Sequence, residues 1–143
     1  MGSKYAREVF DEHAQLLPAG GHPGGGPPWT LSFNNAVRCA GACYYNRRTI
    51  VISRRYLAAV DKAAIRNAVL HEISHGIAGH GAGHGAAWRD VFISLGGDGE
   101  RTCPAFAEHR YTYECPRGCV FKRHVARLAG RLCKRHILPL TLL

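Results

Sequence analysis

The pentapeptide His71-Glu72-Ile73-Ser74-His75, an HExxH pattern, constrains this chain more than any other feature of its 143 residues. In a helix, residues i and i+4 lie one turn apart on the same face, so the two imidazoles can bind one zinc ion. Zinc lowers the pKa of a bound water toward neutrality, and the carboxylate of Glu72 is close enough to take the proton. The motif therefore predicts a catalytic zinc site with a glutamate base.

The surrounding sequence predicts that the motif lies in a long helix. Asp61 is a residue type typical of helix N-caps, and the glycines from Gly79 onward end the helical pattern. An apolar row at i, i+4 spacing lies roughly opposite the two histidines and is expected to pack on a sheet. This row consists of Ile65, Val69, Ile73 and Ile77.

A catalytic zinc also needs a third protein ligand and an open position. The spacing HExxHxxGxxH is excluded, because Ala78 and Gly81 occupy the positions of its glycine and its third histidine. His84 follows a glycine-rich reversal that can bring it back over the metal, and it opens the next helix. His84 is therefore the favoured third ligand. The alternatives are a carboxylate and His80, which would point away from the ligand face.

Short elements surround the motif helix. Alternation of apolar and polar residues predicts strands, three of which suggest a small antiparallel sheet. A high density of glycine and proline predicts an irregular loop at 18–28. The other expected elements are helices at 4–17 and 86–95 and strands at 29–33, 37–45, 49–53 and 111–115. The predicted fold class is α+β, with the sheet packed on the motif helix.

Positive charge is concentrated in the last third of the chain. The formal net charge is +9, from 19 Lys and Arg against 10 Asp and Glu. Residues 101–143 hold nine of the basic side chains and two of the acidic ones, whereas residues 1–100 are nearly neutral. Such an excess favours an anionic partner, of which nucleic acid is the commonest.

Two pairs of candidate metal ligands lie in this basic segment. Cys115 and Cys119 are separated by three residues, and Cys133 and His136 by two. Two such pairs, brought together on turns, form a tetrahedral site for a structural zinc ion. The alternative is a set of reduced thiols without metal. Other residues that could substitute as ligands are Cys103, His109 and His124.

The remaining cysteines and the chain's location are interpreted together. The sequence shows no export signal, so reduced thiols and a cytoplasmic location are expected rather than disulfides. Cys39 and Cys43 have no second pair close in sequence and are expected to be free cysteines packed in the core. No apolar stretch is long enough to span a membrane, so no membrane partner is expected.

Basic side chains in or beside the ligand pairs are expected to contact phosphates. No base-reading pattern is visible, so DNA binding is expected to tolerate any sequence. The interleaved aromatic residues Tyr111, Tyr113 and Phe121 serve equally well as stacking platforms or as core. The candidate DNA-binding residues are Arg117, Lys122, Arg123, Arg127, Arg131, Lys134 and Arg135.

The HExxH motif, the short glycine-rich loop and the HGxxW sequence at 84–88 together resemble the SprT-like family, which includes the Spartan DNA–protein crosslink proteases. Supporting segments run from about residue 29 to residue 136, and residues 1–28 add little. These segments are Trp29 in its strand, RCAGAC at 38–43, IVIS at 50–53, Leu70, LGG at 95–97, RTC at 101–103 and YTYEC at 111–115.

The resemblance implies a minimal zincin metalloprotease domain followed by a zinc ribbon. Glu72 is then the catalytic residue. The catalytic zinc is then bound by His71, His75 and His84. The family's ribbon carries four cysteines, whereas this chain has a wider first pair and a histidine as its last ligand. The expected organisation is a helix and loop at 1–28, the zincin core at 29–102 and a basic ribbon-like segment at 103–143.

These features favour a monomeric, zinc-dependent endopeptidase that acts on DNA-bound or DNA-crosslinked proteins. The alternative is a non-catalytic, zinc-stabilised DNA-binding module, which would have no need of Glu72. A secreted metallopeptidase is a third hypothesis, and the missing export signal and the unpaired-looking cysteines argue against it.

Overall fold

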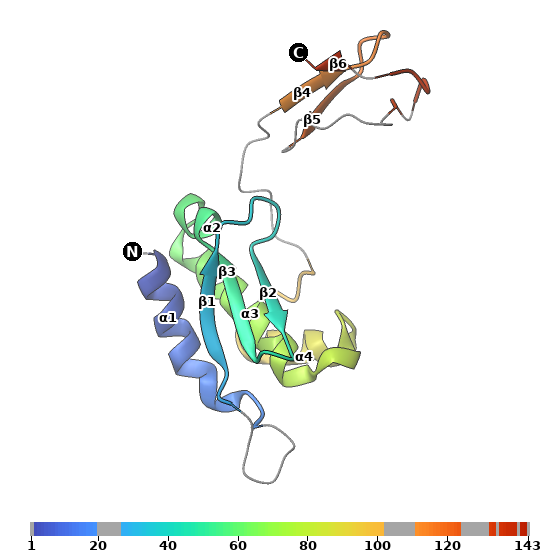
Figure 1. The fold of residues 1–143 in the computed structure, drawn as a ribbon. Coiled ribbons are helices and arrows are strands. Elements are labelled where there is room, and N and C mark those ends of the chain that lie inside the picture. Colours follow the sequence, from blue (N-terminus) through green and yellow to red (C-terminus); the bar gives the residue numbers. More distant parts are fainter. Residues whose placement is uncertain are drawn as a thin grey trace. The chain divides into compact units, whose positions relative to one another are not determined.

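The structure is a computed structural model that describes residues 2–19, 27–101, 111–123, 132–133, 135–139 and 141–142. The chain divides into two compact units, Met1–Phe106 and Ala107–Leu143, which are described separately (Figure 1). The boundary expected from the sequence lies after residue 102. None of the described helices is long and apolar enough to cross a membrane. The predicted α+β class is confirmed, because the described residues form helices and two small sheets.

The first unit begins with α1 (Gly2–His13), which continues into a 3-10 turn, η1 (Ala14–Leu16). This is the helix predicted at 4–17. Its buried side chains, Ala6, Val9 and Phe10, recur at helical spacing and form one apolar face. Most of the loop expected at 18–28 lies outside the described residues.

Three strands follow: β1 (Thr30–Asn34), β2 (Gly41–Tyr44) and β3 (Thr49–Ser53). They form a sheet in the order β1-β3-β2, in which β2 pairs antiparallel with β3 but β1 pairs parallel with β3. The predicted antiparallel sheet is therefore wrong, because one of its two ladders is parallel.

The arrangement has a physical reason in the composition of β3. Ile50, Val51 and Ile52 are all buried, as expected of a strand flanked on both edges. The tight turn at 45–48 places β3 beside β2, so the second edge of β3 is left for β1. The end of β1 and the start of β2 both lie beside the end of β3, since Asn34 pairs with Ser53 and Gly41 with Ile52. Residues 35–40 therefore connect the two outer strands past the end of β3, and β1 runs parallel to β3.

A short helix, α2 (Arg54–Ala59), leads directly out of β3 and was not expected from the sequence. Its N-cap is Ser53, whose hydroxyl accepts a hydrogen bond from the backbone N–H of Tyr56 at 3.3 Å. Tyr56 and Leu57 are its buried side chains.

The motif helix is α3 (Lys62–Ala78). The Asp61 carboxylate accepts a hydrogen bond from the N–H of Ala64 at 2.9 Å, as predicted for an N-cap. Gly79 ends the helix with a φ of 92°, a conformation that favours glycine.

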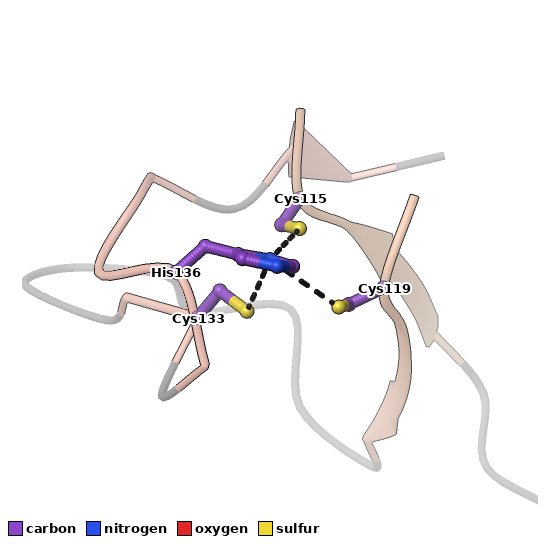
Figure 2. A group of neighbouring side chains, drawn as sticks. All are labelled: Cys115, Cys119, Cys133 and His136. Carbon is purple, nitrogen blue, oxygen red and sulfur yellow. Dashed lines mark hydrogen bonds between the residues drawn. The ribbon is translucent and has the colours of Figure 1, made fainter. Parts of the chain in front are cut away.

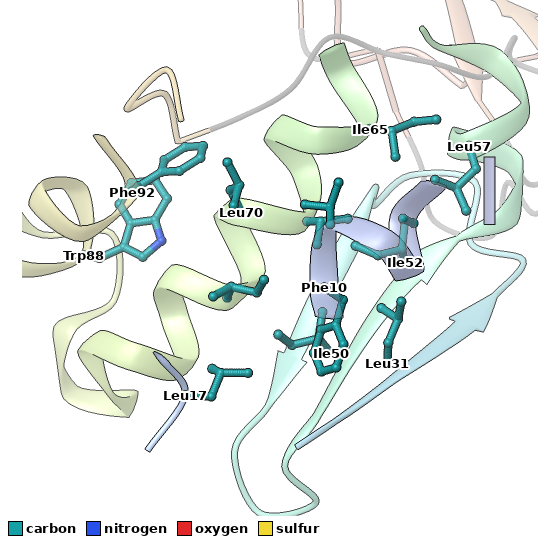
Figure 3. Packing of buried hydrophobic residues seen from close by; sticks show 14 residues of the cluster. Phe10, Leu17, Leu31, Ile50, Ile52, Leu57, Ile65, Leu70, Trp88 and Phe92 are labelled. Atoms are coloured by element: carbon teal, nitrogen blue, oxygen red, sulfur yellow. The ribbon is translucent and has the colours of Figure 1, made fainter. Parts of the chain in front are cut away.

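Figure 3 shows that α3 runs between two layers of apolar side chains. The sheet lies on one side, where Leu31, Ile50 and Ile52 are buried, together with Phe10 of α1. On the other side lies Trp88 of α4 (Ala86–Ser94), which follows a 3-10 turn, η2 (His80–Ala82). The helix that carries HExxH is therefore held from both sides.

The second unit contains a small antiparallel sheet of β4 (Tyr111–Glu114), β5 (Val120–Arg123) and β6 (Thr141–Leu142), in the order β5-β4-β6. The strand predicted at 111–115 corresponds to β4. Tyr113 is 1% exposed, so among the aromatic residues considered for base stacking it belongs to the core of this unit.

Candidate metal centres

Three histidine side chains converge in the first unit. His71 and His75 lie one turn apart on α3, and His84 comes from the turn before α4. The Nε2 atom of His84 lies 3.0 Å from Nε2 of His75 and 3.2 Å from Nε2 of His71. A tetrahedral zinc ion with bonds of about 2.0–2.1 Å places its nitrogen ligands about 3.3 Å apart. The three nitrogens therefore fit one zinc ion.

The loop between α3 and α4 brings His84, and not His80, to this cluster. Gly79 and Gly83 have φ values of 92° and 51°, which glycine adopts readily, and they reverse the chain within a few residues. His80 lies in η2 and packs its ring against Tyr45, with centroids 5.2 Å apart.

Glu72 lies beside the three histidines but is not one of the candidate metal ligands. The residue is 7% exposed, and its Oε1 atom lies 3.9 Å from Nε2 of His71. Burial raises the pKa of Glu72 to about 8. A Cβ atom on Gly41 would lie 3.0 Å from Cγ of Glu72, so a glycine at this position lets β2 pass close to the carboxyl group.

The environment keeps the three imidazoles neutral. Burial, followed by the neighbouring imidazoles, lowers the pKa of His71 to about 4, and burial with the charge of His84 does the same for His75. Burial and the nearby Arg101 also lower the pKa of His84. Neutral imidazole is the form that binds metal, so the site is prepared for a cation.

Trp88 forms the base of this cluster. It is 1% exposed, and its ring centroid lies 4.8 Å from that of His71, 5.3 Å from that of His75 and 4.7 Å from that of His84. Its Nε1–H donates a hydrogen bond to the carbonyl oxygen of His71 at 3.2 Å. The tryptophan of the HGxxW sequence therefore positions all three candidate ligands.

The histidine cluster opens into a cleft of about 500 Å³ between α3 and the edge of the sheet. Side chains with chemistry of their own also line this cleft: Arg38, Cys39, Cys43, Tyr45, Glu72, Glu100 and Arg101. The lining therefore combines a metal site, a buried carboxyl group, a phenol and cations.

The two cysteines of this lining were expected in the core. Cys39 is exposed, so that prediction is wrong for it: it precedes β2 and sits on the wall of the cleft. Cys43 is half-buried and packs against the core cluster. Burial, followed by the charge of Glu72, raises the pKa of Cys43 to about 12 and keeps it a thiol.

A second cluster lies in the second unit (Figure 2). The Nδ1 atom of His136 lies 3.4 Å from Sγ of Cys115, 3.5 Å from that of Cys119 and 3.8 Å from that of Cys133. A zinc ion with bonds of about 2.3 Å to sulfur and about 2.0 Å to nitrogen places such atoms about 3.6 Å apart. The four residues therefore fit one tetrahedral zinc ion.

Two backbone turns hold these ligands. Gly118, with a φ of 85°, donates its N–H to the carbonyl of Cys115 at 2.8 Å. Ile137, with a φ of 53°, does the same to Cys133 at 2.7 Å. Cys115 and Cys133 are 2% and 0% exposed, so this unit is built around their sulfur atoms. The substitutes considered from the sequence, Cys103, His109 and His124, lie outside the described residues.

The candidate DNA-binding side chains are only partly described. Arg117 and Arg135 are exposed beside the cysteine cluster. Lys122 and Arg123 lie on β5, where the structure describes the backbone alone. The other three candidates, Arg127, Arg131 and Lys134, fall outside the described residues.

An α+β unit in which an HExxH helix and a third histidine meet in a cleft has the features of a zinc metalloprotease-like domain. The model of the SprT-like family matches residues 4–108, and the chain therefore belongs to the SprT-like family. The match takes in α1, although residues 1–28 added little to the resemblance seen in the sequence, and it ends before the cysteine cluster. Neither a search of curated proteins nor one of solved structures found a match.

Proposed function

We propose that this chain is a zinc-dependent endopeptidase that cleaves proteins bound or crosslinked to DNA. The observation that carries the proposal is the buried carboxyl group of Glu72 beside three converging imidazoles in an open cleft. His71, His75 and His84 would hold the zinc ion. When bound, zinc polarises a peptide carbonyl and acidifies a water molecule.

Glu72 is the proton carrier in this proposal. Its ionised carboxylate form would accept a proton from the attacking water, and the resulting carboxylic acid would deliver that proton to the amine nitrogen of the departing peptide. A general acid–base group works best with a pKa near the working pH, and burial moves Glu72 in that direction. A helix surface would not supply this burial; the close passage of Gly41 over the side chain does.

The sheet offers a place for an extended substrate. β2 is an edge strand, because its described partner is β3 on one side only. Gly41, Ala42 and Cys43 of this strand line the same cleft as the histidines. An extended peptide can add to such an edge through backbone hydrogen bonds, which is sequence-tolerant. Peptide binding along β2 would bring a scissile carbonyl beside the metal site.

The basic last third supports DNA as the anionic partner. Residues 101–143 carry nine basic and two acidic side chains, and Arg117 and Arg135 are exposed there. Contacts to phosphates release counterions, so the affinity for DNA is expected to fall steeply as salt increases. The second zinc site would contribute the folding energy that this small unit otherwise lacks.

The test compares Glu72→Gln with the wild-type chain on a protein crosslinked to an oligonucleotide. The substitution removes the base and keeps the size of the side chain, so cleavage should fall by about 10²–10⁴-fold while zinc content stays the same. Glu8→Gln is the matched control, because Glu8 is exposed on α1. The same protein without DNA should be cleaved more slowly.

Equal cleavage by the Glu72→Gln variant would overturn the mechanism. Salt-dependent DNA binding by the wild-type chain, with no cleavage under any condition, would instead favour the non-catalytic DNA-binding module.

A further inference from the structure

Tyr45 directly follows β2, the edge strand that borders the cleft, and begins the turn at 45–48. In β2, Gly41 is paired with Ile52 and Cys43 with Ile50, and both isoleucines belong to the core that faces α3. Side chains two residues apart on a strand point to the same side of the sheet. Tyr45 follows Cys43 by two residues, and it lines the cleft together with the histidines.

The phenol of Tyr45 lines the same cleft as Glu72 and the three candidate zinc ligands. Burial raises the pKa of Tyr45 to about 12, and the ionised forms of Cys43 and Glu72 would add to this shift. The group is therefore a protonated hydrogen-bond donor throughout the neutral range. It is half-buried, so it is partly removed from bulk water.

Its ring is fixed, whereas no described residue is hydrogen-bonded to its hydroxyl group. His80 packs edge-on against the ring, at 5.2 Å between centroids and 80° between planes. In the part of the chain that the structure describes, no hydrogen bond to the Tyr45 hydroxyl group is found, and none contributes to its pKa. A donor with a fixed ring, whose O–H no described residue engages, is preorganised for a ligand in this histidine-lined cleft.

We propose that Tyr45 is a further catalytic residue, whose phenolic O–H donates a hydrogen bond to the carbonyl oxygen of the scissile peptide as that oxygen gains negative charge. The inference rests on the proposed peptidase function. It assigns to Tyr45 the stabilisation of the developing oxyanion, while Glu72 moves the proton. His80 is then a positioning residue, because it contacts the ring of Tyr45.

The neighbouring tyrosine supplies a matched control. Tyr44 is 40% exposed, it points to the opposite side of the strand, and Arg47 lies over its ring at 4.7 Å. Tyr45→Phe and Tyr44→Phe each remove one phenolic oxygen atom from adjacent positions. The first should lower kcat by about 10²–10³-fold with less than about a threefold change in KM, and the second should change neither.

A binding measurement separates this inference from the proposed function. The zinc-loaded proteins are titrated with a phosphinic peptide, whose tetrahedral phosphorus carries anionic oxygens where the reacting carbonyl would be, and with acetohydroxamate, a small zinc ligand. Tyr45→Phe should bind the phosphinic peptide at least about tenfold more weakly than wild type and acetohydroxamate equally well.

The role of Tyr45 would be overturned if Tyr45→Phe and wild type had equal affinity for the phosphinic peptide, or equal kcat. The proposed function would still stand in that case, provided that cleavage depends on Glu72. Failure of the proposed function would appear differently, as a wild-type chain without Glu72-dependent cleavage. That result would overturn catalysis by Tyr45 as well.

Discussion

The indole N–H of Trp88 donates a hydrogen bond to the carbonyl oxygen of His71 at 3.2 Å. This contact joins α4, which follows the third histidine, to α3, which carries the first two. The indole ring also lies 4.7–5.3 Å from all three imidazoles, centroid to centroid. One buried side chain therefore sets the geometry of a site whose ligands come from two separate elements.

Substitution of Trp88 by phenylalanine should weaken zinc binding. Phenylalanine keeps an aromatic ring in contact with the imidazoles but cannot donate to His71. Loss of a group that orients ligands typically costs about 10–100-fold in metal affinity, and we expect a value in that range for the histidine site. The measurement is competition with a chromophoric chelator.

Trp29→Phe provides the control for that experiment. The Nε1–H of Trp29 also donates to a carbonyl at 3.2 Å, that of Pro18, but at a position outside the histidine cluster. It should leave zinc affinity unchanged. A similar loss of affinity in both variants would show that Trp88 acts only through general stability.

The histidine site should hold its metal to unusually low pH. Protons compete with metal only when the pH approaches the pKa of the ligand, and the pKa values of His71 and His75 are lowered to about 4. Three imidazoles with ordinary pKa values of about 6.5 would lose about a thousandfold in affinity between pH 7.5 and 5.5. Here we expect less than about a tenfold loss over that interval.

The experiment uses the Glu72→Gln variant, which removes the titrating carboxyl group 3.9 Å from Nε2 of His71. Cobalt(II) serves as the probe, because its absorption distinguishes nitrogen-only ligation from thiolate ligation in the second unit. A thousandfold loss at the histidine site would contradict the lowered pKa values.

The features that were correctly predicted are those with local signals. Asp61 and Gly79 mark the ends of α3 through backbone chemistry that involves only adjacent residues. The spacing of His71 and His75 reflects the helical repeat, so one face of the helix could be assigned from the sequence alone. The glycine-rich reversal before His84 is also local, since positive φ values at two glycines produce it.

The features that were missed depend on contacts between distant residues. Alternation identifies a strand but not its partner, so the parallel pairing of β1 with β3 could not be read from either strand. Helix α2 has only six residues, too few for a periodic signal. Cys39 is apolar by type, but its exposure follows from its place before an edge strand, which the sheet order decides.

Substitution of Cys133 by serine should remove one zinc ion and unfold the second unit alone. Cys133 is 0% exposed, and its sulfur lies 3.8 Å from Nδ1 of His136. Its substitution therefore removes one of the four candidate ligands of the tetrahedral site. Zinc content should fall from two ions per chain to one, because a small metal-centred unit folds with its metal. DNA binding should fall with it.

Cys39→Ser is the control for metal content, since Cys39 is an exposed thiol outside both metal clusters. It should retain two zinc ions. One zinc ion in the wild-type chain and in both variants would mean that the cysteine cluster binds no metal.

Gly97→Ala should destabilise the first unit through Phe92. A Cβ atom on Gly97 would overlap the ring of Phe92, which is 0% exposed, and Gly97 is also tied to the carbonyl of Phe92 by a hydrogen bond of 2.8 Å. Forced repacking of a filled core costs about 1–3 kcal/mol. The ring of Phe92 lies 5.1 Å from that of Trp88, so zinc affinity at the histidine site should fall as well.

Gly81→Ala is the matched control, because a Cβ atom there would meet nothing within 4 Å. Denaturation in guanidinium chloride should show a lower midpoint for Gly97→Ala and an unchanged midpoint for Gly81→Ala. If both variants unfold like wild type, the end of α4 is loosely packed. The close approach of residue 97 to Phe92 would then contribute nothing to the support of Trp88 beneath the histidines.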